Sequence, residues 1–335
     1  MHALVTGAGG FLGRYIVEAL VARGDRVRSL ARGEYSELKE IGVEMVRGDV
    51  RDPQAVADAC RDIDCVFHTA ARPGIDLRWR LYDEVNRVGT LNVLAACRTT
   101  GVGRLVYTSS PSVVFAGADQ NGCDEREPYD FAWMKANRAY YSLSKALAEQ
   151  AVLQANDNSL RTCALRPHLI WGPRDGHLIP RLIERARSGR LRRVGDGANL
   201  VDMIHVENAA EAHLRAADAL GETASAVGGK AYFLSQNEPI NCWHWINEIL
   251  ALVNLPPVAK SISLPAARRV GLACETLWRI ARLPGEPPMT RFLASQLATS
   301  HWFDVSAARL DFDYQPRVST AEGMRQLGEW LRSTK

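Results

Sequence analysis

The 335-residue sequence has no strong excess of either charge, no cysteine framework and no long apolar run. Its 41 lysines and arginines exceed its 38 aspartates and glutamates by only three, which argues against a general field for nucleic acid. The seven cysteines contain no CxxC pair, so neither a disulfide framework nor a zinc site is indicated. A glycine-rich segment beginning at Gly7 leaves no room for a secretory leader. We therefore expect a cytoplasmic protein without a metal or nucleic-acid partner and with at most peripheral membrane contact.

The sequence does contain enough apolar residues, 47%, to bury a sizeable core. Its first half alternates short β-branched runs with helical patterns, which is typical of parallel βαβ units. The predicted strands are 3–5, 27–30, 43–46, 65–68, 105–108 and 162–165. Beyond residue 167 proline becomes denser and the pattern is mainly helical. We predict a doubly wound α/β domain over 1–166, a smaller mixed, mainly helical domain over 167–335, and a segment 201–220 that packs back on the first.

A glycine loop lies between the first predicted strand and the first helix. Its spacing is Gly7-x-x-Gly10-x-x-Gly13, with Phe11 and Leu12 opening the helix. Glycines there let a pyrophosphate approach the bare backbone and meet the helix N-terminus. This context predicts a Rossmann fold that binds a nicotinamide dinucleotide.

The ends of the next strands refine the cofactor prediction. In a dinucleotide fold an acidic residue after strand two selects the free ribose hydroxyl of NAD, but here Ala31 is followed by Arg32. A guanidinium pairs with a 2′-phosphate, so NADPH is favoured over NADH. After strand three, the Asp49 carboxylate either accepts from adenine, beside Val50, or caps its own turn. Small residues after strand four leave space for the cofactor: Thr69, Ala70 and Ala71.

Two hydroxyl-bearing segments predict the chemistry. Tyr141 and Lys145 are four residues apart in a helical stretch, so both side chains lie on one helix face. An ammonium near the phenol is expected to lower the pKa of Tyr141 and make it a proton donor near neutral pH. Ser109 and Ser110 follow strand five, at the sheet edge where such folds place their ligands.

The combination of motifs resembles the extended short-chain dehydrogenase/reductases across nearly the whole chain. Within that superfamily the segment 106–115 is similar to the 3β-hydroxysteroid dehydrogenase branch, and the segments 179–182, 229–233 and 285–292 resemble bacterial reductases that act on 2-alkyl-3-oxoalkanoates in long-chain olefin biosynthesis. The motifs occur in the order TGxxGFLG from Thr6, GDVRD from Gly48, HTAA from His68, Asn86, YTSS from Tyr107, YxxxK from Tyr141 and LRPHLIWGP from Leu165.

The resemblance implies a role for each matching residue. Ser110 matches the catalytic serine, with Ser109 as the alternative; Tyr141 matches the general acid, and Lys145 the lysine that holds the nicotinamide ribose. Asn86 matches an asparagine that orders the site, and the backbone after Pro167 would meet the carboxamide. The adjacent His168 either assists the site or is a satisfied buried histidine. Val201 stands where sugar-nucleotide enzymes of the superfamily carry an arginine, which disfavours a diphosphate substrate.

The implied function is NADPH-dependent reduction of the 3-keto group of a long-chain 2-alkyl-3-oxoalkanoate to the 3-hydroxy acid. The alternatives are a 3β-hydroxysteroid dehydrogenase and, from another class, a nucleotide-sensing regulator that need not keep serine, tyrosine and lysine together. Family habit favours a homodimer, and enzymes of the same pathway are possible partners.

A basic amphipathic helix is predicted within residues 264–283. Val270, Ala273, Leu277 and Ile280 recur at helical spacing, and arginines lie at both ends. Such a stripe packs into the core of the second domain, or it forms a mobile lid over an apolar tunnel with its arginines near lipid headgroups or a partner enzyme.

Overall fold

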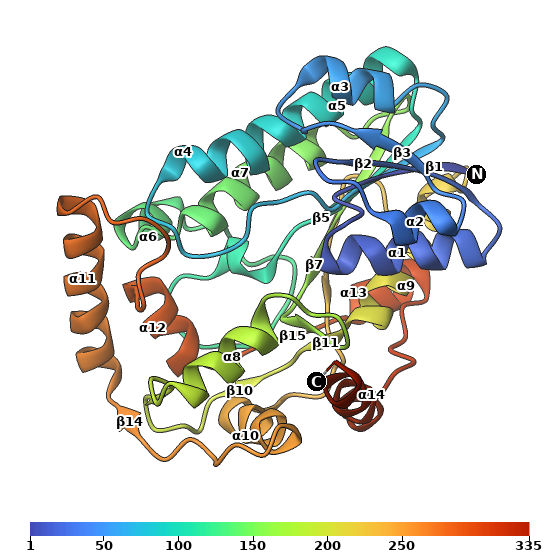
Figure 1. Ribbon diagram of the computed structural model, residues 1–335. Coiled ribbons are helices and arrows are strands. Elements are labelled where there is room, and N and C mark those ends of the chain that lie inside the picture. The colour runs from blue at the N-terminus through green and yellow to red at the C-terminus, as the bar shows by residue number, and fades with distance from the viewer. Residues whose placement is uncertain (335) are drawn as a thin grey trace.

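A seven-stranded parallel sheet forms the centre of the molecule (Figure 1), and the computed structural model describes residues 1–334. The strand order is β12-β7-β5-β4-β1-β2-β3, and every neighbouring pair is parallel. The strands are β1 His2–Thr6, β2 Arg26–Ala31, β3 Glu44–Arg47, β4 Cys65–His68, β5 Arg104–Thr108, β7 Arg161–Pro167 and β12 Ala231–Leu234. The six strands predicted from the sequence are confirmed, and β12 adds an edge strand.

Helices cover both faces of this sheet, as a doubly wound fold requires. One face packs against α1 (Phe11–Ala22) and α9 (Val206–Gly221). The other face packs against α3 (Pro53–Ala59), α5 (Gly89–Thr100) and α7 (Tyr140–Gln154). The shorter elements along these connections are α2 Ser36–Glu40, α4 Trp79–Tyr82, η1 Asp83–Val88, η2 Pro111–Val114, β6 Gln120–Cys123 and α6 Phe131–Ala136. The predicted fold class is confirmed.

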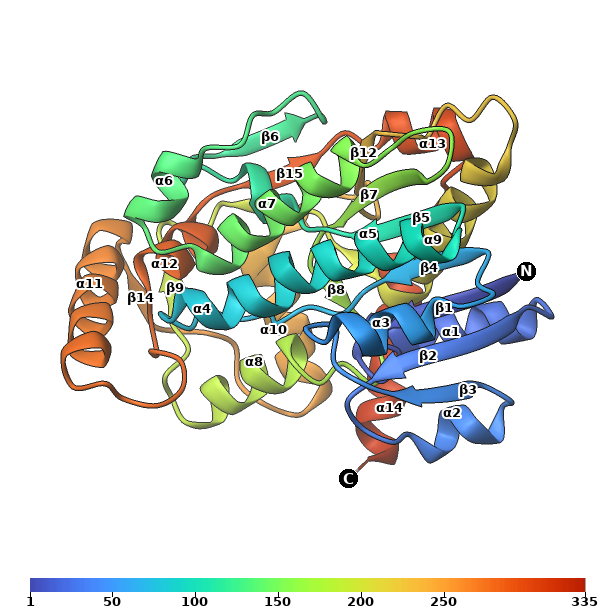
Figure 2. The ribbon, with the colours of Figure 1, turned by 90° about the horizontal axis from the view of Figure 1, so that it is seen from above.

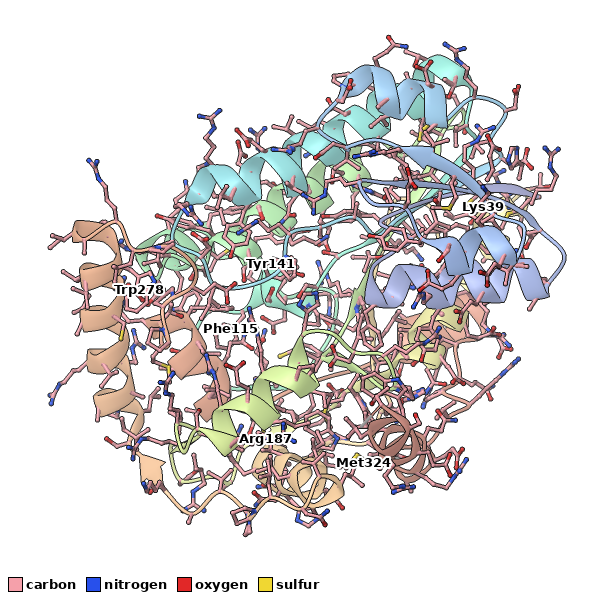
Figure 3. All side chains as sticks on the ribbon, viewed as in Figure 1. Lys39, Phe115, Tyr141, Arg187, Trp278 and Met324 are labelled. Carbon is pink, nitrogen blue, oxygen red and sulfur yellow. The ribbon has the colours of Figure 1, made fainter. Side chains whose placement is uncertain are left out.

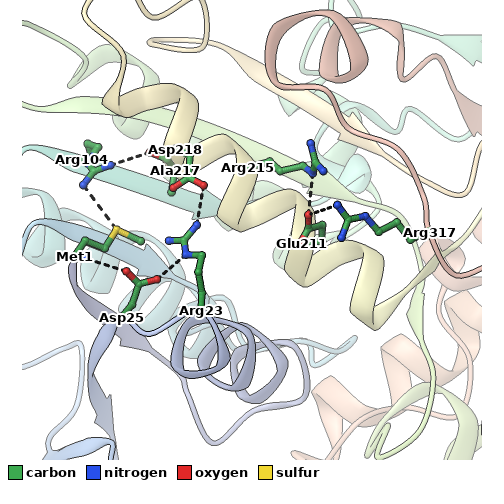
Figure 4. Close-up of polar contacts among 9 residues, drawn as sticks. All are labelled: Met1, Arg23, Asp25, Arg104, Glu211, Arg215, Ala217, Asp218 and Arg317. Carbon is green, nitrogen blue, oxygen red and sulfur yellow. Dashed lines mark hydrogen bonds and ion pairs between the residues drawn. The ribbon is translucent and has the colours of Figure 1, made fainter.

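Helix α9 returns from the second half of the chain to the sheet of the first. Figure 4 shows the polar contacts that hold it there: Arg23 Nη1 lies 2.7 Å from a carboxylate oxygen of Asp218, and Arg104 Nη1 donates to the Ala217 carbonyl at 3.1 Å. Asp25 pairs with both Arg23 and the N-terminal amino group of Met1. These contacts connect α9 to the beginning of the chain and to β5.

The remaining residues form a smaller part built on a mixed four-stranded sheet in the order β13-β10-β15-β6. Its core contains the buried Trp171, Trp243 and Trp245. The turn at 195–197 does not form a hairpin, because β9 pairs with β14 whereas β10 pairs with β13 and β15. The further elements are β8 Ile170–Trp171, α8 Leu178–Arg187, β9 Arg193–Val194, β10 Leu200–Val201, β11 Ile204–His205, β13 Ile240–Asn241, α10 Cys242–Leu252, β14 Ser261–Ile262, α11 Leu264–Ile280, α12 Arg291–Ala298, β15 His301–Phe303, α13 Ser306–Phe312 and α14 Thr320–Ser333.

The amphipathic helix α11 lies at the edge of the molecule, outside α12, in both ribbon views (Figures 1 and 2). Its inward residues are Ala267, Gly271 and Glu275, whereas Val270 and Leu277 are exposed. The prediction that the stripe packs into the core is therefore wrong, whereas the lid stays a prediction. Instead the stripe faces away from the core.

Candidate active site

The glycine loop after β1 is built so that only glycine fits. Gly7 has φ +74°, and a Cβ there would lie 2.9 Å from backbone atoms of Ala70 on β4's loop. A Cβ on Gly13 would lie 2.3 Å from the Gly7 carbonyl oxygen, so α1 could not start so close to the strand. The Gly10 N–H closes the turn onto the Gly7 carbonyl at 2.8 Å. This bare backbone forms a cradle at the N-terminus of α1 that suits a pyrophosphate.

A cavity of about 770 Å³ opens over this loop at the carboxyl ends of the strands. Its volume is large enough for a dinucleotide. The site residues predicted from the sequence that line it are Gly7, Gly10, Arg32, Asp49, Val50, Thr69, Ala70 and Ala71. Outside the lining are Phe11, Leu12, Gly13, Tyr141, Lys145 and Pro167. The residues that line it but were missed include Tyr35, Arg72, Gly74, His177 and Arg181.

The residues after β2 and β3 lie at the cavity, but what they bind stays a prediction. Ala31 is buried and Arg32 is exposed at the cavity. Asp49 caps its own turn, since its carboxylate accepts from the Arg51 N–H at 2.9 Å and from the Arg51 guanidinium at 2.8 Å and 3.0 Å. The hydrogen bond from Arg51 is the main reason that the pKa of Asp49 is lowered. An adenine contact by Asp49 stays a prediction.

Lys145 and Tyr141 both project from α7, and Figure 3 places Tyr141 near the centre of the molecule. The Lys145 ammonium donates to the Thr108 carbonyl at the end of β5 and lies 4.0 Å from the centroid of the Tyr107 ring. Burial lowers the pKa of Lys145 to about 7, against the opposing charge of Glu149. The lysine is therefore positioned between the helix and the end of β5.

The predicted lowering of the Tyr141 pKa is wrong. Burial raises the pKa of Tyr141, and the neighbouring Ser110 hydroxyl acts in the opposite direction. The physical reason is that the described contacts of the Lys145 ammonium are with Thr108 and Tyr107 rather than with the phenol. Tyr141 consequently keeps its proton at neutral pH, as a proton donor must.

The structure distinguishes the two serines after β5. Ser110 caps η2 and shares a 3.0 Å hydrogen bond with the Ser112 hydroxyl. A hydrogen bond between Ser110 and Tyr141 also acts to lower the pKa of Tyr141. The Ser109 hydroxyl is buried and has no hydrogen-bond partner among the described residues. Ser110 is thus better placed for the catalytic role, which stays a prediction.

Asn86 lies in the π-turn η1, a type of irregularity often found at functional sites. Its side-chain amide donates to the Ser144 hydroxyl at 2.9 Å, and its carbonyl oxygen accepts from the Arg72 N–H at 2.7 Å. The buried Asn86 therefore fixes the loop after β4 relative to α7, beside Tyr141. This arrangement agrees with an ordering role.

His168, directly after β7, is a satisfied buried histidine in a chain of three polar side chains. Its Nδ1 lies 2.8 Å from Asp202 Oδ1, and its Nε2 lies 3.0 Å from His301 Nδ1. His301 Nε2 faces the Gln296 carbonyl, so it must donate, and burial lowers the pKa of His301 to about 4. A neutral His301 then accepts from the His168 Nε2–H. These hydrogen-bonded side chains connect the end of β7 to the small four-stranded sheet.

A carboxylate missed by the sequence prediction closes the rim of the cavity. Glu286, in the segment between α11 and α12, accepts from the Ile75 N–H at 3.0 Å and pairs with Arg181 of α8 at 2.8 Å. A Cβ on Gly74 would lie only 1.8 Å from that carboxylate, so glycine permits the approach. The sequence marked 285–292 only as a family-like stretch, because nothing local indicates contacts more than a hundred residues away.

No helix within residues 1–334 is both long and apolar enough to cross a membrane.

Comparison with known proteins places the chain in a family and agrees with its fold. A model of the 3-beta hydroxysteroid dehydrogenase/isomerase family matches residues 4–265. The 2-alkyl-3-oxoalkanoate reductase of Stenotrophomonas maltophilia is 51% identical over 332 residues, covering 98% of each chain. Mouse sterol-4-alpha-carboxylate 3-dehydrogenase, decarboxylating, is 34% identical over 96% of this chain and 88% of its own. A dTDP-glucose 4,6-dehydratase structure from Streptomyces venezuelae shares the fold, with a TM-score of 0.75, 22% identity and coverage of 99% and 97% of the two chains.

Proposed function

The chain belongs to the 3-beta hydroxysteroid dehydrogenase/isomerase family and is an NAD(P)-dependent oxidoreductase, and we propose that it uses NADPH to reduce the 3-oxo group of a long-chain 2-alkyl-3-oxoalkanoate to the 3-hydroxy acid. The observation that carries this proposal is the hydrogen-bonding proximity of Ser110 to Tyr141, on the same helix as Lys145, in a fold that also has a glycine cradle after β1. The name and the 51% identity of the Stenotrophomonas relative support the substrate class.

Each side chain has a chemical task in this reaction. The bound cofactor would supply the hydride to C3, held by the glycine loop, the residues after β2 and β4, and Lys145. The Ser110 hydroxyl donates a hydrogen bond to the 3-oxo oxygen and orients it. Tyr141 then gives its phenol proton to the oxygen as negative charge develops there, which breaks the Tyr141 O–H bond and forms the product hydroxyl. The phenolate regains a proton from water, while Lys145 would keep the cofactor in place.

The proposed preference for NADPH rests on Ala31 and Arg32 at the cavity. Arg32→Ala removes a cation that lines the cavity directly after β2, so NADPH should bind about 10- to 100-fold more weakly, equivalent to about 1.5–3 kcal/mol. NADH should be nearly unaffected. Fluorescence titration with both cofactors measures this, and Arg26→Ala, an exposed arginine at the other end of β2, is the matched control. Equal affinity of the unmutated protein for NADPH and NADH would overturn the preference.

A second candidate is a 3β-hydroxysteroid dehydrogenase, which the 34% identical sterol relative favours. A nucleotide-sugar substrate is disfavoured, because Val201 is buried in the core of the small part and offers no cation to a diphosphate. NADPH oxidation over 2-alkyl-3-oxoalkanoates, 3-ketosteroids and nucleotide sugars tests the proposal. We expect the highest kcat/KM with the 2-alkyl-3-oxoalkanoates, and faster turnover of the steroids would replace it with the second candidate.

We also propose the organisation around this reaction. Residues 1–166, with the returning segment 201–220, would bind the cofactor, and residues 167–335 would supply the substrate pocket. The protein would act in the cytoplasm as a homodimer, in olefin biosynthesis alongside other enzymes of that pathway. Support comes from the family relationship and from the position of α9 against α1.

A further inference from the structure

The outer face of α11 is an exposed apolar surface. Among residues 1–334 nine large apolar side chains are exposed, and five of these fall between positions 270 and 283. Val270 is 46% exposed, Leu277 54% and Ile280 73%, and they lie on the same side of the helix because their spacing follows the helical period. Exposed apolar side chains are ordinary singly, but such a concentration marks an interaction surface.

The opposite face of α11 already packs against the rest of the protein, so the exposed stripe is the outer face of the helix. A Cβ on Gly271 would lie 2.6 Å from the backbone of Thr290, which shows how closely α11 approaches the start of α12. The buried Glu275 carboxylate accepts from the Arg291 N–H at 2.8 Å and from its guanidinium at 3.0 Å. These contacts hold the helix in place with its stripe outward.

The charges around the stripe are of one sign. Arg268, Arg269 and Arg279 belong to α11 and Arg282 follows it, whereas the single acidic residue of the helix is the buried, paired Glu275. Arg269, Arg279 and Arg282 are exposed. An apolar stripe flanked by cations complements the acyl and headgroup region of an anionic bilayer. Unlike a protein partner, a bilayer requires no matching shape or hydrogen-bonding pattern.

We propose that the outer face of α11, namely Val270, Leu277 and Ile280 with Leu283 and the flanking arginines, docks the protein on an anionic lipid surface. The edge position of the helix leaves this face open in Figures 1 and 2. The segment after α11 carries Glu286 to the rim of the nucleotide cavity, where it contacts Ile75 and Arg181. Docking through α11 therefore places that rim close to the bilayer.

Sedimentation with vesicles tests this proposal without any assay of turnover. Wild-type protein should sediment with phosphatidylcholine vesicles containing 30% phosphatidylglycerol, and much less with phosphatidylcholine alone or in high salt. Leu277→Asp and Ile280→Asp should each lower the partition coefficient by roughly tenfold, because each replaces an inserting apolar side chain with a charge. Leu310→Asp, at a position 84% exposed on α13, should bind like wild type and serves as the matched control.

Two companion measurements separate docking from other effects. The melting temperature of Leu277→Asp should stay close to that of wild type, because the side chain is exposed in the folded protein. Equal vesicle binding by wild type and Leu277→Asp, or equal binding to neutral and anionic vesicles, would overturn the proposal. A dimeric wild type that becomes monomeric in Leu277→Asp, seen by light scattering, would also overturn it by showing that a second copy covers this face.

Discussion

Tyr141→Phe is expected to lower kcat for ketone reduction by roughly 10²- to 10⁴-fold while leaving NADPH binding nearly unchanged. The substitution removes only the phenolic proton, and burial, which raises the pKa of Tyr141, ensures that this proton is present at neutral pH. The neighbouring Ser110 hydroxyl does not replace it, because an aliphatic hydroxyl is a far weaker acid than a phenol. Steady-state kinetics and cofactor titration on the same protein separate the two effects.

The adjacent Tyr140 provides the matched control for this experiment. Its ring packs edge-on against Trp79 at 5.9 Å, and the residue four positions later is Ser144 rather than lysine. Tyr140→Phe should therefore keep nearly wild-type kcat. A Tyr141→Phe variant that retains more than a tenth of wild-type kcat would assign the proton donor to another residue.

Glu149→Gln is expected to destabilise the fold by about 3–5 kcal/mol, because it leaves a buried guanidinium without its counter-charge. Glu149 on α7 pairs with Arg166 on β7 at 2.6 Å, and both side chains are almost completely buried. The Tyr129 hydroxyl donates to the same carboxylate at 2.6 Å, so β7 and the segment before α6 both lose their partner on α7. Urea denaturation followed by circular dichroism gives the change in unfolding free energy.

An exposed ion pair provides the control for the stability change of Glu149→Gln. Asp58 and Arg61 approach to 2.6 Å at the end of α3, but their side chains are 46% and 67% exposed. Asp58→Asn should therefore cost less than about 1 kcal/mol. If the two variants lost equal stability, the buried pair would not be the structural element that its geometry indicates.

The central sheet was predictable because its information is local. Each of the six strands is a short β-branched run next to a helical period, and the Asp52 cap of α3 lies in the residues that form it. The edge strand β12 was not predicted, because it forms through pairing with the distant strand β7 and not through a local pattern. In the small sheet, two-residue strands such as β10 and β13 meet across about forty residues, and no sequence period reveals such a contact.

The site divides in the same way. The glycine loop and the Tyr141–Lys145 pair carry their geometry in their spacing, so both were found. The direction in which the Tyr141 pKa shifts was predicted wrongly, because the shift depends on burial and on the Lys145 contacts with β5. Glu286 and Arg181 were missed because the chain separates them by 105 positions and brings them together only at the rim of the cavity.

Transfer of label from cofactor to product tests the proposed reaction most directly. NADPH carrying deuterium at both C4 positions of the dihydronicotinamide would be incubated with a long-chain 2-alkyl-3-oxoalkanoate, and the product analysed by mass spectrometry. We predict a 3-hydroxy acid with one deuterium at C3 from the wild-type protein, and almost none from Tyr141→Phe. An unlabelled hydroxy acid, or no product from this substrate while a 3-ketosteroid is labelled, would contradict the proposed function.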